Sequence, residues 1–273
     1  MTNYPSSVDV SSRFFLQAGG TLGRNLFAQA VHEIGTRIVS GALRPGETLP
    51  KEQELGRELG ISRSVMREAI KSLASKGLVE SRSRVGTRIR EPIYWNLLDP
   101  DVLAWRYRTM PPAEFFHSMY EVRRVIEPAA AGLAAEKASE ADIAAIEKAC
   151  RDMETADPTT DDAMVADLAF HRAILAACQN DVLLQMGTLI GVGLLTSFKI
   201  AQPAYDASLP MHRPVLEAIR ARQPAQARSA MQTLLSRNLE FIERHLLRES
   251  TTLKERPVSE LDKNESERQN SDS

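Results

Sequence analysis

The residues with the clearest capacity for chemistry are an aspartate and a histidine four positions apart. Asp167 and His171 lie in a segment with helical periodicity, so both side chains project from one face of a helix. A carboxylate oxygen and an imidazole nitrogen at this spacing can bind one divalent metal ion, and His212 is a candidate third ligand. Alternatively, Asp167 and His171 form a surface pair and His212 is an ordinary surface or core residue.

A second pair with helical spacing is Arg123 and Glu127, within an apolar helical segment. An internal guanidinium requires an anion, and a ligand carboxylate can accept two parallel hydrogen bonds from it. The alternative is that Arg123 forms an ion pair with Glu127 and binds no ligand. The pattern therefore indicates either a carboxylate-binding site or an internal ion pair.

Basic side chains are concentrated in one quarter of the chain. Residues 24–92 hold 13 basic and 8 acidic residues, a net charge of +5, whereas residues 93–273 hold 20 and 27, a net charge of −7. The total of −2 argues against nucleic-acid binding over the whole surface. The uneven distribution instead predicts a polyanion-binding head on an acidic body.

Length and composition restrict the class of protein. The chain of 273 residues is long enough for two domains, and 43% hydrophobic residues can form a core. Cys150 and Cys178 do not make a disulfide framework, so we expect a reducing compartment. The N-terminus has no signal-peptide pattern, and the apolar run 182–198 contains Gln and Gly, which favours a buried helix. We expect a soluble, cytoplasmic protein with no membrane association.

Residues 23–92 contain the elements of a winged helix-turn-helix. An apolar stripe with helical spacing begins at Leu26, a short helix is expected over 50–60, and Ser62 is a plausible N-cap for a helix over 63–75. Two strands, 78–82 and 87–89, flank a turn at 83–86. The inward-facing residues of the third helix are predicted to be Val65, Ala69, Ile70 and Leu73.

The outward face of the 63–75 helix is suited to the major groove of DNA, because it offers small and basic side chains near its N-terminus. The basic hairpin can follow the backbone or enter the minor groove. A solvated basic face is the alternative, but the order of turn, helix and wing favours DNA binding. The basic and small residues concerned are Arg63, Ser64, Arg67 and Lys71 on the helix, and Arg82, Arg84 and Arg88 on the hairpin.

Several motifs in this region resemble the signature of GntR-type bacterial transcription regulators. They are Arg44-Pro45-Gly46 through Leu49-Pro50, Leu59-Gly60-Ile61-Ser62-Arg63, Arg67-Glu68-Ala69, Leu73, Gly77-Leu78-Val79 and Gly86-Thr87. The resemblance implies operator contacts from the second helix, the recognition helix and the wing. Together with the basic residues above, the expected contacts are Gln53, Ser62, Arg63, Ser64, Arg67, Lys71, Arg82, Arg84, Gly86 and Thr87. The family often has Arg where this chain has Gln53, and Gly where it has Arg84. The resemblance therefore does not predict the sequence of the DNA half-site.

The rest of the chain is predicted to be helical. We expect a flexible arm over 1–22, a linker over 93–110 with a short helix beginning at Pro100, and a disordered tail over 249–273. Leu103 and Trp105 should pack between the two modules. Residues 111–248 should form an all-α antiparallel bundle with helices at 112–138, 139–156, 160–179, 181–201, 207–222 and 224–248.

This helical region resembles the ligand domain of the FadR subfamily, the FCD type. The resemblance is carried by Glu121-Val122-Arg123 through Glu127-Pro128, Asp167 through Phe170-His171, Asn180, and His212 through Ala218-Ile219. It implies a dimerisation and effector domain that binds a divalent ion, Zn²⁺ or Ni²⁺, through Asp167, His171 and His212. The fourth histidine of the subfamily is replaced here by Leu234. The implied effector contacts are Arg123, Glu127 and Asn180.

Together these features predict a homodimeric regulator of transcription that binds double-stranded operator DNA and is not an enzyme. The linker resembles that of members acting on sugar acids, which implies a repressor of a galactonate-like catabolic operon, released by a carboxylate effector. Three alternatives remain open from the sequence. They are a metal-dependent enzyme using Asp167, His171 and His212, a repressor or activator responding to another organic acid, and an architectural DNA-binding protein without a ligand.

Overall fold

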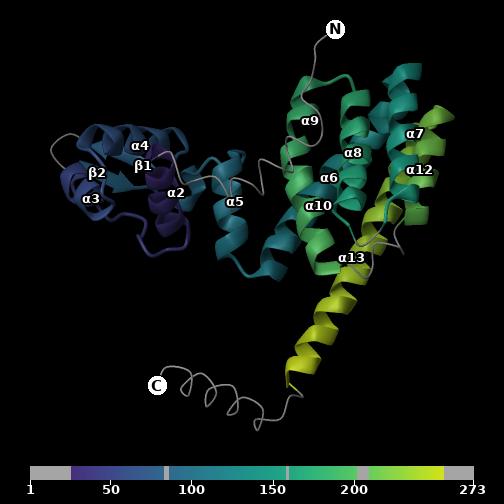
Figure 1. Ribbon diagram of the computed structural model, residues 1–273. Coiled ribbons are helices and arrows are strands. Elements are labelled where there is room, and N and C mark those ends of the chain that lie inside the picture. Colours follow the sequence, from purple (N-terminus) through teal and green to yellow (C-terminus); the bar gives the residue numbers. More distant parts are fainter. Residues whose placement is uncertain (1–25, 83–85, 158–159, 202–208, 255–273) are drawn as a thin grey trace.

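The protein consists of a small N-terminal head and a larger helical bundle, joined by a short connecting helix (Figure 1). The structure is a computed structural model that describes residues 26–82, 86–157, 160–201 and 209–254. The predicted arm 1–22, most of the predicted tail and Arg84 lie outside the described residues. The described part is mostly helical with one two-stranded sheet, so the predicted fold class is confirmed.

The head contains three helices and a wing. Its helices are α2 (Leu26–Val39), α3 (Glu52–Glu58) and α4 (Arg63–Ser75), and its strands are β1 (Val79–Arg82) and β2 (Gly86–Ile89). The strands pair antiparallel with Val79 opposite Ile89. The Ser62 hydroxyl accepts a hydrogen bond from the Val65 amide, so the predicted N-cap of α4 is confirmed. One prediction was wrong: Met66 is fully buried, whereas Val65 is only half-buried.

The connecting helix α5 (Pro100–Thr109) contacts both modules. It follows a 3₁₀ turn, η2 (Pro92–Tyr94), and Asp99 caps its first turn. Trp105 belongs to the core of the head, and its indole Nε1 donates to Nδ1 of His32 at 3.0 Å. Leu103 instead packs with Phe115 and Val192 of the bundle. The prediction that Leu103 and Trp105 pack between the modules is therefore confirmed.

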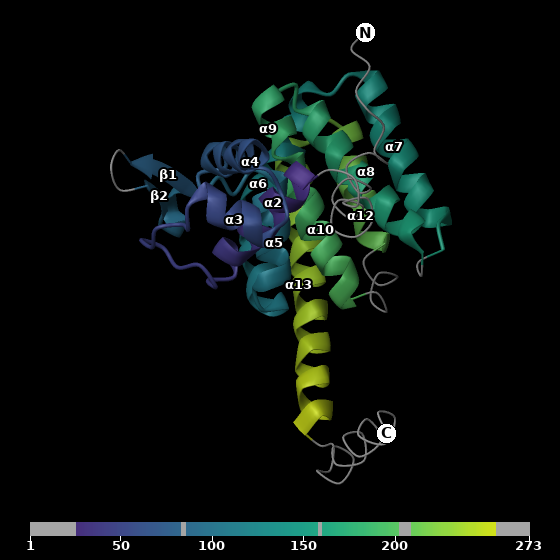
Figure 2. The same cartoon turned by 60° about the vertical axis from the view of Figure 1, so that its left-hand side comes forward.

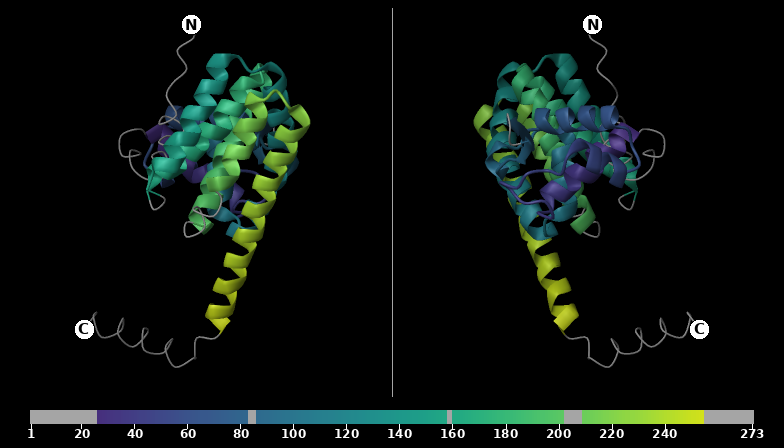
Figure 3. Two further views of the ribbon diagram at one scale, coloured as in Figure 1. Left: turned by 90° about the vertical axis from the view of Figure 1, so that its right-hand side faces the viewer. Right: turned by 90° about the vertical axis from the view of Figure 1, so that its left-hand side faces the viewer.

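The bundle is built from long helices that run side by side (Figures 1 and 3). Among these helices, α13 packs along α6 and leaves the bundle at its C-terminal end (Figure 2). The elements of the bundle are α6 (Pro112–Lys137), α7 (Glu140–Thr155), α8 (Asp161–Ala177), α9 (Asp181–Gln185), α10 (Gly187–Ala201), η4 (Leu209–Met211), α12 (His212–Arg220) and α13 (Pro224–Lys254).

Three helix boundaries differ from those predicted. The helix expected over 181–201 is interrupted at Met186, which separates α9 from α10. The first two residues of the helix expected over 207–222 lie outside the described residues; residues 209–211 form a 3₁₀ turn, and α12 starts at His212. Helix α13 continues to Lys254, beyond the expected end at Arg248. Boundaries of this kind depend on local capping and packing, which apolar periodicity does not encode.

Helix α10 packs against α6, α8 and α13 and explains the most apolar run in the sequence. Residues 181–198 are long and apolar enough to cross a membrane by length and composition, but 56% of this window is buried inside the protein. Residues 190–198 are all buried. A helix that is apolar on every side suits the interior of a bundle, so this finding agrees with the predicted core helix.

Candidate functional site

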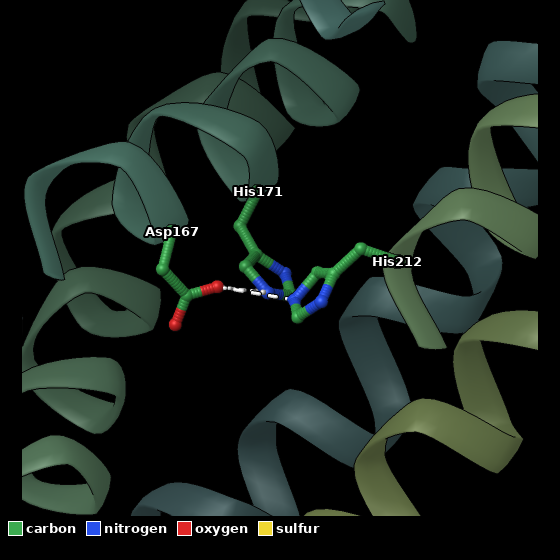
Figure 4. A group of neighbouring side chains, drawn as sticks. All are labelled: Asp167, His171 and His212. Carbon is green, nitrogen blue, oxygen red and sulfur yellow. Dashed lines mark hydrogen bonds and ion pairs between the residues drawn. The ribbon is translucent and has the colours of Figure 1, made fainter. Parts of the chain in front are cut away.

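Asp167, His171 and His212 converge inside the bundle (Figure 4). Asp167 and His171 are one turn apart on α8, and His212 is the first residue of α12. Oδ1 of Asp167 lies 3.3 Å from Nε2 of His171 and 3.2 Å from Nε2 of His212. All three side chains are buried. The predicted pair is therefore not a surface pair, and the structure brings all three candidate ligands together.

Each histidine is oriented by a contact on the opposite side of its ring. Nδ1 of His171 lies against Oε2 of Glu127, and neither atom has a further partner within the described residues. Nδ1 of His212 lies 3.3 Å from the carbonyl oxygen of Leu209. When each Nδ1 carries the only ring proton and donates it outward, the lone pair of each Nε2 faces Asp167 and is available to a metal ion. This arrangement, in which an outer carboxylate or carbonyl fixes the tautomer, is typical of metal-binding histidines.

The spacing of these atoms matches the demands of a small divalent ion. Two ligands on a tetrahedral ion at roughly 2.0–2.1 Å are about 3.3–3.4 Å apart. The separations of Asp167 Oδ1 from the two Nε2 atoms, 3.3 and 3.2 Å, are close to this value. Two imidazoles and one carboxylate are also ligands that Zn²⁺ and Ni²⁺ accept. Leu234, at the fourth position, is part of the apolar core on α13 and offers no ligand atom.

Arg123 and Glu127 extend the cluster along α6. Nε of Arg123 donates to Oε1 of Glu127 at 2.5 Å, and both side chains are 3% exposed. Within the described residues, Arg123 makes this contact through Nε, and its two terminal amino groups make no hydrogen bond. Arg123 thus makes the predicted internal pair with Glu127, while the end of its guanidinium fork is left for another anion. A guanidinium fork at this place can bind a carboxylate through two parallel hydrogen bonds.

A glycine on α10 gives Arg123 the space it occupies. A Cβ atom added to Gly193 would lie 2.8 Å from Cδ of Arg123, closer than real contacts allow. The aliphatic stem of Arg123 therefore passes directly over the α10 backbone at this point. Gly193 was not predicted as part of the site, because a lone glycine in an apolar helix carries no signal for such a role.

The electrostatics of the cluster are those of paired buried ions. Burial opposes ionisation of His171, Glu127 and Asp167, but neighbouring charges and hydrogen bonds outweigh it. The charge of Glu127, with the hydrogen bond to Asp167, raises the pKa of His171 to about 9 despite burial. Arg123 and His171 lower the pKa of Glu127 to about 2. Hydrogen bonds from His171 and His212 hold the pKa of Asp167 well below its usual range.

Asn180, a predicted effector contact, is the N-cap of a helix in this structure. Its Oδ1 accepts hydrogen bonds from the amides of Val182 and Leu183, at 3.0 and 3.2 Å, and so caps the start of α9. The residue is exposed, whereas the clustered side chains are buried. The structure therefore gives Asn180 a capping function and does not include it in the buried site.

The predicted DNA contacts that the structure describes lie on the surface of the head. Gln53 is exposed on α3, and Ser62, Arg63, Ser64, Arg67 and Lys71 are exposed along α4. On the wing, Arg82 and Gly86 are exposed and Thr87 is half-buried. Gly86 has φ +105°, a conformation that L side chains rarely adopt, which explains glycine at the start of β2.

One residue on this surface was not predicted. Glu52, the first residue of α3, accepts hydrogen bonds from Arg63 at 3.4 Å and from Arg67 at 3.3 Å. It lies 11 and 15 residues before these arginines, so no helical spacing connects them in the sequence. Only the packing of α3 against α4 brings the three together.

Comparisons with known proteins agree with both regions. Residues 26–89 match the bacterial regulatory proteins of the gntR family, and residues 118–237 match the FCD domain. The chain is 33% identical over 207 residues to the galactonate operon transcriptional repressor of Escherichia coli (strain K12), covering 74% of this chain and 90% of that protein. It is 31% identical over 202 residues to the HTH-type transcriptional regulator LutR of Bacillus subtilis (strain 168), covering 71% and 90%.

A solved structure has the same fold. It belongs to Lar, described as controlling expression of the Listeria monocytogenes agr system. It matches with a TM-score of 0.57 and 17% sequence identity, over 81% of this chain and 98% of that chain. At this identity the likeness concerns the fold alone.

Proposed function

Because the chain belongs to the GntR family of bacterial regulatory proteins and carries the FCD domain of its FadR subfamily, we propose that it is a homodimeric repressor of a sugar-acid catabolic operon. It is a DNA-binding regulator of transcription and not an enzyme. In this proposal a carboxylate effector binds in the bundle and releases the protein from its operator. The observation that carries it is the buried Arg123, whose guanidinium fork is only partly used by Glu127.

The exposed face of α4 and the wing are assigned to the operator. Arg63 and Arg67 lie at the N-terminal end of the recognition helix, where side chains reach base edges in the major groove. Ser62 and Ser64 bond to each other at 3.0 Å beside them and can donate to phosphates. Two heads related by two-fold symmetry would read a palindrome with half-sites about one helical turn apart. Such a regulator works in the cytoplasm, where the bacterial chromosome lies.

The effector site is assigned to the buried cluster of α6, α8 and α12. Asp167, His171 and His212 would hold a Zn²⁺ or Ni²⁺ ion, with a position left for water or effector because Leu234 supplies no ligand. When bound, such an ion attracts a carboxylate oxygen as a Lewis acid. Arg123 would bind the same carboxylate through its terminal amino groups. A sugar acid is proposed because one relative at 33% identity is a galactonate operon repressor.

The helix α6 supports a route from this site to the head. It carries Arg123 and, two turns earlier, Phe115, which packs with Leu103 of α5 and Val192 of α10. The same α5 inserts Trp105 into the core of the head. An effector that draws Arg123 toward itself would change how α6 and α10 hold α5. Release of DNA requires only that the effector binds tighter to the arrangement that cannot bind DNA.

The test combines ligand and DNA binding on the purified full chain. A thermal-shift screen of sugar acids, with and without added Zn²⁺, should find one acid that raises the unfolding temperature. The same acid should release the wild-type protein from a duplex selected from a randomised library. Arg123→Lys should keep DNA binding but lose this response, because lysine cannot make a bidentate contact. Tighter DNA binding on addition of the acid, or a response only to an unrelated organic acid, would contradict the proposal.

A further inference from the structure

Glu52 lies between the two arginines that head the recognition helix. Its Oε2 accepts from Nε of Arg63 at 3.4 Å and from a terminal nitrogen of Arg67 at 3.3 Å, and Oε1 accepts from Nε of Arg67 at 3.4 Å. The Glu52 side chain is 28% exposed, against 69% for Arg63 and 50% for Arg67. One carboxylate therefore holds two guanidinium groups, and the three side chains together carry a net charge of +1.

The carboxylate is ionised at neutral pH. Burial by itself would raise the pKa of Glu52, but the hydrogen bonds from Arg67 and Arg63 lower it below its ordinary value. Exposed pairs of this kind contribute little to stability. The arginines can consequently leave Glu52 for DNA at little cost, yet the negative charge stays on the same face of the head.

This fixed negative charge affects two kinds of DNA contact differently. A backbone phosphate that binds either guanidinium is held close to the Glu52 carboxylate, and like charges repel. A guanidinium on the guanine edge meets the neutral acceptors O6 and N7 on the floor of the groove, farther from phosphate. A charge that disfavours phosphate contacts more than guanine contacts increases specificity for the matching sequence.

We propose that Glu52 is a specificity-determining positioning residue of the DNA-binding head. It holds Arg63 and Arg67 together at the groove-facing end of α4 and opposes their transfer to backbone phosphates, so binding without a matching sequence is weakened. The inference rests on the proposed assignment of these two arginines to base edges.

The experiment compares matched and unmatched DNA. The full-length wild-type protein first selects a duplex from a randomised library. Dissociation constants are then measured for this duplex and for a scrambled duplex of the same length and composition, over a series of salt concentrations. The variants are Glu52→Gln and Glu68→Gln. Glu68 is the matched control, because it pairs with Lys71 on the same helix at 2.9 Å and contacts neither arginine.

For Glu52→Gln we expect scrambled DNA to bind about fivefold tighter or more, and the ratio of selected to scrambled affinity to fall by about tenfold. The salt dependence on scrambled DNA should steepen as the freed arginines reach phosphates. Glu68→Gln should strengthen binding to both duplexes by a similar factor. Glu52→Asp keeps the charge and should retain most of the ratio. A ratio for Glu52→Gln within twofold of wild type, or equal to that of Glu68→Gln, would overturn the inference.

An Arg63→Ala variant separates this inference from the proposed function. Loss of binding to the selected duplex by Arg63→Ala, with an unchanged ratio for Glu52→Gln, would reject the role of Glu52 alone. Retained specific binding by Arg63→Ala would reject the assignment of the arginine and the role of Glu52 together. Thermal unfolding of each variant shows whether the head remains folded.

Discussion

His171 on α8 and Glu127 on α6 are in contact through Nδ1 and Oε2, across two different helices. The other oxygen of the same carboxylate accepts from Nε of Arg123. One buried carboxylate thus orients a candidate metal ligand and a candidate effector ligand at once. This places the proposed metal site and the proposed carboxylate site in one hydrogen-bonded network, so a change at either is expected to affect the other.

Replacement of Glu127 by Gln should weaken metal binding by about 10- to 100-fold, because outer partners that orient metal-binding histidines have effects of this size. An uncharged amide no longer stabilises the Nδ1–H tautomer of His171 as strongly. Zn²⁺ affinity is measured by competition with a chelating dye. Glu121→Gln, an exposed change on the same helix, is the control and should leave the affinity unchanged. An affinity for Glu127→Gln within threefold of wild type would contradict the assigned role.

Metal binding should compete with protons. With its pKa raised to about 9, His171 of the metal-free protein is protonated at neutral pH, and Nε2 must lose a proton before it can bind an ion. We therefore expect Zn²⁺ affinity to rise by about tenfold per pH unit between about pH 6 and pH 8, and to level off above the pKa. Calorimetry in buffers of different ionisation enthalpy measures the proton released. A pH-independent affinity would contradict the assignment of His171 as a ligand.

Gly193→Ala should impair the effector response and leave DNA binding intact. The added methyl group would lie 2.8 Å from Cδ of Arg123 and would displace the guanidinium from its place beside Glu127. We expect the sugar acid found in the screen to act at concentrations about tenfold higher or more, since a bidentate contact depends on geometry. Gly187→Ala on the same helix is the control, because its nearest contact, Leu175, is at an ordinary 3.6 Å. Equal responses of the two variants would remove Gly193 from the site.

Gly35→Ala should destabilise the head, although alanine ordinarily favours a helix. A Cβ atom at position 35 would lie 2.4 Å from the buried Trp105 ring, and overpacking of this kind costs about 1–3 kcal/mol. The midpoint of thermal or urea unfolding should fall accordingly. Trp105→Phe removes the ring atoms that clash, so the double variant should lose less stability than the sum of the single changes. Strict additivity would show that the two residues do not meet as described.

Much of the fold follows from local features of the sequence. The i, i+4 spacing determines that Asp167 and His171 share a face, and that Arg123 and Glu127 do, because a helix turns every 3.6 residues. Ser62 before a basic amphipathic run determines the start of α4 in the same local way. These features, with the charge asymmetry, were sufficient to predict a basic winged head on a helical bundle. His212 was also a candidate ligand from the sequence, and the structure places it beside Asp167 and His171.

The tertiary structure alone decided which groups meet across elements. The contact of His171 with Glu127, the fit of Arg123 over Gly193 and the bridge from Glu52 to Arg63 each join residues that no helical period connects. It also showed Asn180 as a helix cap, because capping depends on where the chain turns. Periodicity specifies which face of a helix is buried. What that face is buried against depends on the packing of whole helices, which is a property of all their side chains together.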